Sequence, residues 1–141
     1  MTTKSLFKIL SNHLVLTFFT SSLCTFITYS ILSSRDKSSL EGRQADFIQA
    51  IAGIFWILVL TISSLPIYFN LKSIVRQKRI LSFISFFFLP ILVTIIFWLT
   101  GDKDAEWLSF YIATSYFLSA QFISYLLFIR RNKSLLRTIS N

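Results

Sequence analysis

Charged side chains are missing from four long stretches of this sequence. Residues 14–32, 47–69, 80–100 and 107–129 contain no Asp, Glu, Lys, Arg or His. Each stretch is long enough to cross a bilayer as a helix, because a span needs about 20 apolar residues. The whole chain has 141 residues, of which 54% are hydrophobic and 14% charged, too few charges for the polar shell of a soluble domain. The sequence therefore predicts an integral membrane protein.

The residue types that carry catalysis or ion coupling are equally scarce. No carboxylate or histidine lies within the apolar runs, which argues against a proton-coupled transporter. The sequence has no CxxC pair, no glycine-rich phosphate loop and no nucleophile beside a base. His13 has no Cys, Asp or Glu at ligand spacing and is expected to be an interfacial residue. We expect no enzymatic activity, no cofactor and no metal site.

Glycine and cysteine are also rare. The three glycines are too far apart for a GxxxG pair and too few for a glycine-built ion filter. The single cysteine, Cys24, excludes an intramolecular disulfide.

The charges that are present are sorted between the links. Of the 14 Lys and Arg, two lie before residue 14, four in Asn70–Arg79 and four after residue 129, while all six acids lie in 33–46 and 102–106. A net charge of +8 would also fit nucleic-acid binding, but apolar runs would divide such a basic surface. Basic links on the cytoplasmic side are the pattern that membrane insertion produces. The sequence predicts a multi-pass protein of the cell (inner) membrane with both termini in the cytoplasm.

We expect one membrane domain, 1–141, with helices at about 9–32, 41–70, 79–100 and 104–130. Short links place consecutive helices side by side, so the predicted fold class is all-α. It is an antiparallel bundle of four transmembrane helices with the N- and C-termini inside. A cleaved signal peptide is the competing interpretation of the first helix. However, the run is longer than a normal signal-peptide core and lacks a clear cleavage site.

Two prolines lie within the predicted spans. Pro66 should kink the last turn or two of the second helix. Pro90 lies near the middle of the third, where it is tolerated when neighbours or Ser and Thr side chains satisfy the carbonyl that proline frees. Trp56 lies near mid-span, away from the interfaces, and is expected to fill the bundle core.

Uncharged polar residues recur at helical spacing on three of the predicted helices. Against lipid these groups would be poorly placed, so their faces should point at other helices. One interpretation is that they form the seams of the bundle itself. The other is that one stripe docks a partner helix or lines a polar cavity. The stripes are Thr17, Ser21, Cys24 and Thr28; Gln49, Gly53, Trp56, Leu60, Ser63, Ile67 and Asn70; and Tyr111, Thr114, Leu118, Gln121 and Tyr125.

The size, the four spans and the absence of a catalytic set give a layout similar to that of small immunity proteins for pore-forming bacteriocins. This resemblance covers topology alone. It implies a non-enzymatic protein that binds a membrane-acting toxin within the bilayer and neutralises it. The toxin's helix would then meet the last stripe, and the charged outer links would hold its soluble part by electrostatic complementarity. The residues of this predicted partner site are Tyr111, Thr114, Gln121, Tyr125, Arg35, Lys37 and Arg43.

Two other functions remain open. A homo-oligomeric pore or defence effector would place the last stripe around a lumen. An accessory subunit would use the stripes to bind a larger membrane complex. A transporter of a small neutral or lipidic molecule is disfavoured by the scarcity of glycine.

Overall fold

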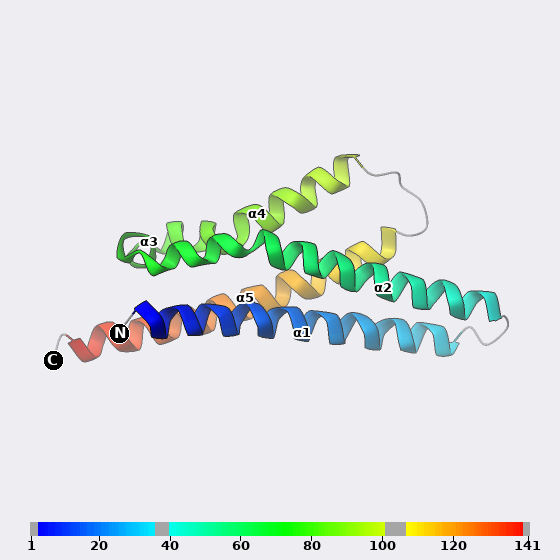
Figure 1. Ribbon diagram of the computed structural model, residues 1–141, viewed down its shortest axis with the longest axis horizontal. Coiled ribbons are helices and arrows are strands. Elements are labelled where there is room, and N and C mark those ends of the chain that lie inside the picture. The colour runs from blue at the N-terminus through cyan, green and yellow to red at the C-terminus, as the bar shows by residue number, and fades with distance from the viewer. Residues whose placement is uncertain (1–2, 36–39, 101–106, 140–141) are drawn as a thin grey trace.

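The protein is helical almost throughout the part of the chain that the structure describes. This computed structural model describes residues 3–35, 40–100 and 107–139, and the side chains of 33–35, 40–43, 45, 107 and 132–139 are not described. Within those ranges every residue is helical except Ser64, Lys72 and Lys78. In chain order (Figure 1) the elements are α1 (Thr3–Arg35), α2 (Leu40–Ser63), the 3-10 helix η1 (Leu65–Leu71), α3 (Ser73–Gln77), α4 (Arg79–Thr100) and α5 (Trp107–Ile139).

Four helical segments of the described chain are long and apolar enough to cross a membrane, namely Thr3–Leu32, Asp46–Leu71, Arg79–Thr100 and Leu108–Arg131. Both α1 and α5 have 33 residues. At 1.5 Å per residue each is about 50 Å long, whereas the hydrocarbon core is about 30 Å thick. These two helices begin or end several residues beyond the predicted bounds, because charged residues mark where a chain leaves hydrocarbon and do not stop a helix.

The second span changes its helix type near Pro66. The sequence predicted a kinked helix to residue 70, but α2 ends at Ser63 and the chain continues as η1. The Ser64 amide bonds the carbonyls of both Leu60 and Thr61 at 3.1 Å, which is the transition from i−4 to i−3 bonding. Proline has no N–H and its ring clashes with the carbonyl four residues earlier, so regular α-helical bonding is disrupted near Pro66. The span remains helical to Leu71, and the disturbance expected at Pro66 takes the form of a change from α- to 3-10 helix.

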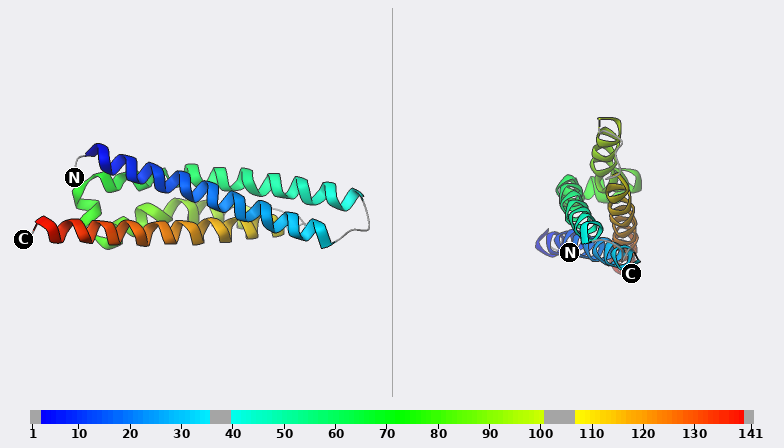
Figure 2. Two further views of the ribbon diagram at one scale, coloured as in Figure 1. Left: turned by 90° about the horizontal axis from the view of Figure 1, so that it is seen from below. Right: turned by 90° about the vertical axis from the view of Figure 1, so that its right-hand side faces the viewer.

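The basic link between the second and third spans is itself short and helical. Lys72 (φ −74°, ψ 128°) and Lys78 (φ −90°, ψ 109°) are extended and flank the single turn of α3. These two extended residues reverse the chain, so that η1 and α4 contact each other. The two chain termini and α3 lie at the same end of the molecule (Figures 1 and 2).

The distribution of side chains is the opposite of that in a soluble protein, with many apolar residues exposed and many polar residues buried. Large apolar residues face outward, as with Phe19 (64% exposed) and Phe55 (66%), while ten described Ser, Thr, Asn and Gln side chains are buried. Apolar residues cost nothing against acyl chains, whereas polar groups there need internal partners. The fold is therefore that of an all-helical, multi-pass membrane protein.

Three of the long helices pack closely and the fourth is attached to them at one side. α1, α2 and α5 all contact one another, whereas α4 contacts η1, α2 and α5. Toward its C-terminal end α4 diverges from the other helices (Figures 1 and 2). Trp56 is 7% exposed within one of the two apolar clusters of the core, as expected from its mid-span position.

The three packed helices approach one another closely at Gly53. A Cβ atom at this position would lie 3.0 Å from Cγ2 of Thr25 on α1 and 3.6 Å from Cβ of Ala113 on α5. Small residues at this crossing let the helix backbones approach closely, which is how membrane helices gain packing energy.

We expect Gly53→Leu to destabilise the protein by about 1–3 kcal/mol, because the added side chain overpacks this crossing. Gly53→Ala is the finer test, since a methyl group conflicts chiefly with Cγ2 of Thr25. Adding Thr25→Ser removes that atom and should raise the unfolding temperature of Gly53→Ala. Thermal unfolding in detergent, followed by circular dichroism, measures both effects. A wild-type unfolding temperature for Gly53→Leu would contradict the close crossing.

Candidate functional site

The predicted polar stripe on α5 divides into two parts in the structure. Gln121 and Tyr125, at the end nearer α3, are buried at 1% and 7% exposure. Thr114 is half-buried and Tyr111 is 51% exposed. The four residues are therefore not one continuous surface, and each pair has its own environment.

Gln121 bonds a backbone group that proline leaves without its normal partner. Its side-chain Nε2 donates to the carbonyl of Phe86 at 3.2 Å. In an unbroken helix that carbonyl would accept from the amide of residue 90, but Pro90 has no N–H. The expectation that a neighbour satisfies this carbonyl, and that Gln121 faces protein, is confirmed.

Tyr125 is also used inside the protein. Its hydroxyl donates to the carbonyl of Arg79 at 3.3 Å, at the first turn of α4. Its ring lies 5.1 Å from Phe86 and 5.7 Å from Phe87 in edge-to-face geometry. Edge-to-face pairs of this kind stabilise by about 0.5–1.5 kcal/mol each. Gln121 and Tyr125 therefore join α5 to α4, and the seam interpretation fits them better than the partner-site interpretation.

Tyr111 and Thr114 lie at an open groove instead. Thr114 Oγ1 accepts from Nε1 of Trp56 on α2 at 2.8 Å, and the Tyr111 hydroxyl accepts from Nε1 of Trp98 on α4 at 2.6 Å. The groove has a volume of about 310 Å³ and lies where α4 diverges from α5. It is lined by Trp56, Thr94, Ile95, Phe97, Trp98, Phe110, Tyr111 and Thr114.

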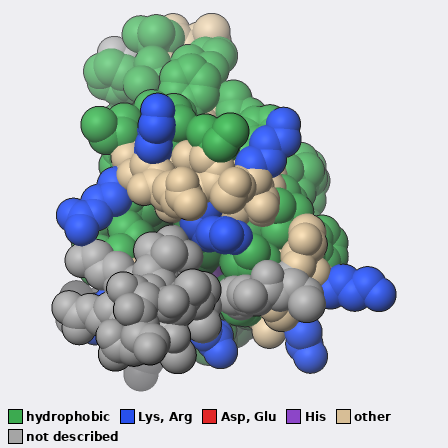
Figure 3. Space-filling view, turned by 90° about the vertical axis from the view of Figure 1, so that its left-hand side faces the viewer, with side chains coloured by type: hydrophobic (Ala, Val, Ile, Leu, Met, Phe, Trp, Pro, Cys, Tyr) green, Lys and Arg blue, Asp and Glu red, His purple; other side chains and the backbone are tan. Residues whose placement is uncertain are grey.

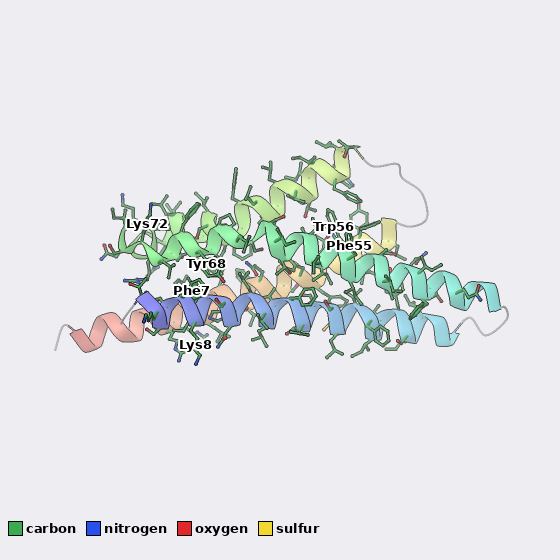
Figure 4. All side chains as sticks on the ribbon, in the orientation of Figure 1. Phe7, Lys8, Phe55, Trp56, Tyr68 and Lys72 are labelled. Carbon is green, nitrogen blue, oxygen red and sulfur yellow. The ribbon has the colours of Figure 1, made fainter. Side chains whose placement is uncertain are left out.

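Aromatic rings form the floor of this groove, which we call the α4–α5 groove. The ring centroids of Trp56 and Phe97 are 4.4 Å apart, and Phe110 lies 4.9 Å from Phe97. Figure 4 labels Trp56 where α2 passes α5. None of the lining residues is ionisable near neutral pH, so the groove suits an apolar group with at most one hydrogen-bonding atom.

Sequence reasoning missed the half of the groove that α4 contributes. Trp98, Thr94 and Phe97 were not among the predicted partner-site residues. The spacing of Thr94 and Trp98, one helical turn apart on the side beyond Pro90, was the available signal. This spacing alone did not predict the groove, because the residues of α4 do not indicate the direction in which that helix diverges from the bundle.

The polar stripe on the first helix contacts α5 in the described structure. Thr17 Oγ1 lies 3.1 Å from Ser124 Oγ, and Thr28 Oγ1 lies 2.8 Å from the Tyr116 hydroxyl, both from α1 to α5. Cys24, predicted to share this face, is a half-buried free thiol. The fully buried position next to it is Thr25, which the predicted stripe did not include.

The charged part of the predicted partner site stays untested. Arg35 ends α1 and Arg43 lies in α2, but neither side chain is described, and Lys37 lies outside the described residues. Among the residues that the structure describes, no group of three or more His, Cys, Asp and Glu is placed to hold a metal ion.

Comparisons with known proteins give no relative from which a function would follow. No family model, no curated protein and no solved structure matches this chain.

We expect Gln121→Leu to reduce stability by about 1–3 kcal/mol, because it leaves the buried carbonyl of Phe86 without a donor. Pro90→Ala supplies the missing backbone N–H, so Gln121→Leu should cost much less in the Pro90→Ala background. A double-mutant cycle from unfolding in mixed detergent measures this coupling. Additive effects of the two substitutions would show that Gln121 does not compensate for Pro90.

Proposed function

We propose that this protein binds a partner within the bilayer, as an immunity protein that neutralises a membrane-acting, pore-forming toxin. The observation that carries the proposal is the α4–α5 groove, an aromatic recess between two membrane-spanning helices. Trp and Tyr are the residues most often found at the energetic centres of protein interfaces. A toxin helix that passed along α4 and α5 would place one bulky side chain in this groove, beside Trp98 and Tyr111.

The size and chemistry of the groove favour this role over the alternatives. Its volume of about 310 Å³ lies at the lower end of the range for small-molecule pockets, about 300–1,000 Å³. A side chain fits such a space better than a transported solute does. A pore would need its polar stripe to face a lumen, whereas Gln121 and Tyr125 donate their hydrogen bonds to α4.

The membrane orientation is part of the same proposal. We place both termini and α3 at the cytoplasmic face, in an antiparallel bundle of four spans in the inner membrane. Support comes from the described Lys and Arg side chains that surround this end of the molecule, with no acidic side chain visible among them (Figure 3). The α4–α5 groove then opens toward the outer half of the bilayer. There Arg35, Lys37, Arg43 and the acids of the outer links would meet the soluble part of the toxin.

Cysteine labelling tests the orientation. In a Cys24→Ser background, Val75→Cys should react with an impermeant thiol reagent only after the membrane is opened, because Val75 lies in α3. Ala105→Cys, in the link that the charge pattern places outside, should react in intact cells. Labelling of Val75→Cys in intact cells would show that α3 lies outside and that the proposed orientation is wrong.

A pair of adjacent substitutions tests the partner site. Ile95 lines the α4–α5 groove, whereas Ile96, which is 52% exposed, does not. Ile95→Trp should fill the groove and lower survival at least tenfold when cells face the pore-forming toxin encoded beside the gene. Ile96→Trp is the matched control and should protect as the wild type does.

Protection is read as colony survival, with the amount of membrane-inserted protein measured in the same cells. Equal protection by Ile95→Trp and wild type at equal amounts would remove the groove from the proposal. If the wild type protects against no toxin encoded beside its gene, the immunity function is wrong. Membrane leakage on overexpression alone would then identify a pore.

A further inference from the structure

A second groove lies at the opposite end of α4, beside the basic turn. It runs between η1, α3 and the first half of α4 and has a volume of about 540 Å³. We call it the η1–α4 groove. It is lined by Pro66, Phe69, Lys72, Val75, Leu81, Ile84, Ser85, Phe88 and Leu89. Lys72 is thus the one charged residue in a lining that is otherwise almost wholly apolar.

Lys72 lies just beyond the candidate span that ends at Leu71, at the end of this groove where the chain leaves the hydrocarbon layer. Lys72 is exposed and joins η1 to α3, at the end of the molecule where the chain turns (Figure 4). Three further basic residues, Arg76, Lys78 and Arg79, follow within seven positions, and no acid interrupts them. The one charged residue of the lining therefore begins a basic stretch of the sequence that contains no acid.

The wall of the groove continues from this cation along the membrane-spanning part of α4. Ile84 is 45% exposed and Phe88 is 58% exposed, one turn further along the helix. Phe69, 59% exposed, faces the same groove from η1. A ligand that follows this wall passes from a charged end into the hydrocarbon layer.

The single polar group on the wall is already satisfied within the protein. Ser85 Oγ donates to the carbonyl of Ser82 at 2.8 Å and accepts from Nδ2 of Asn70. A peptide lying here would have backbone N–H and C=O groups with no partner, which is costly in an apolar environment. An acyl chain has no such groups and loses nothing.

We propose that the η1–α4 groove is a binding site for an anionic phospholipid. The phosphate lies at Lys72, and one acyl chain follows Phe69, Ile84 and Phe88 along α4. Basic pockets between membrane helices on the cytoplasmic side are known to bind anionic headgroups in this way. The site is separate from the α4–α5 groove and does not depend on what that groove binds.

Native mass spectrometry of the purified protein tests the site. Detergent micelles would contain equal amounts of phosphatidylglycerol and phosphatidylcholine with identical acyl chains. We expect phosphatidylglycerol to be retained in preference, and Lys72→Gln to weaken its binding about fivefold, the usual effect of one Lys near an anionic lipid surface. Lys8→Gln is the matched control, since Lys8 is exposed on α1 at the same end but away from the groove (Figure 4).

A second pair of variants tests the apolar wall with the charge intact. Ile84→Trp fills the groove and should abolish lipid retention, whereas Ile80→Trp, at a position 75% exposed and outside the lining, should not. Inorganic phosphate in excess should fail to displace the lipid, because it has no acyl chain. Equal weakening by Lys72→Gln and Lys8→Gln, equal retention of the two lipids, or displacement by phosphate would each overturn the proposal.

Discussion

A proline in the middle of a membrane span frees a carbonyl that needs another donor, and this constraint organises the contact between α4 and α5. Pro90 removes the donor for the Phe86 carbonyl, and Gln121 replaces it. No water is present in the hydrocarbon core to do so, where an unpaired carbonyl costs several kcal/mol. On the α3 side of this bond the two helices remain in contact through Tyr125. On the other side α4 diverges, and the aromatic groove occupies the space between the helices.

The same constraint explains why most hydroxyls of the spans do not mark a binding site. Ser21, Thr61 and Thr94, among others, donate to the carbonyl four residues earlier in their own helix. A hydroxyl bonded in this way can face either lipid or protein at little cost. Other described side chains form hydrogen bonds between helices, such as that between Thr17 and Ser124. Such bonds contribute about 0.6 kcal/mol on average, so close packing of small residues must supply the rest of the stability.

The sequence predicts the features of the fold and of the site that depend on a single helix, but not those that depend on how the helices pack together. The bounds of α4, the burial of Trp56 and the need for a donor near Pro90 could be predicted. Each depends only on the residues of a single helix and on the apolar environment of the bilayer. The 3-10 segment after Ser63 could not be predicted, because proline permits either a kinked α-helix or a tighter one and the packing of η1 decides. Tyr111 shares a helical face with Gln121 but not its burial, since the neighbouring helix has turned away by then. A periodic pattern gives the direction of a side chain and not the distance to its neighbour.

The two grooves lie along α4 for the same structural reason. α1, α2 and α5 form a closed unit around Gly53, where a single methyl group would already meet Thr25. At this crossing there is little room for another group between the helices. α4 is joined to it by η1, by Gln121 and by aromatic contacts, and it leaves space on both sides of Pro90. Binding surfaces belong where packing is incomplete and a rigid scaffold holds the walls in place. In this protein the tight crossing of three helices provides the scaffold, and the fourth helix provides the surface.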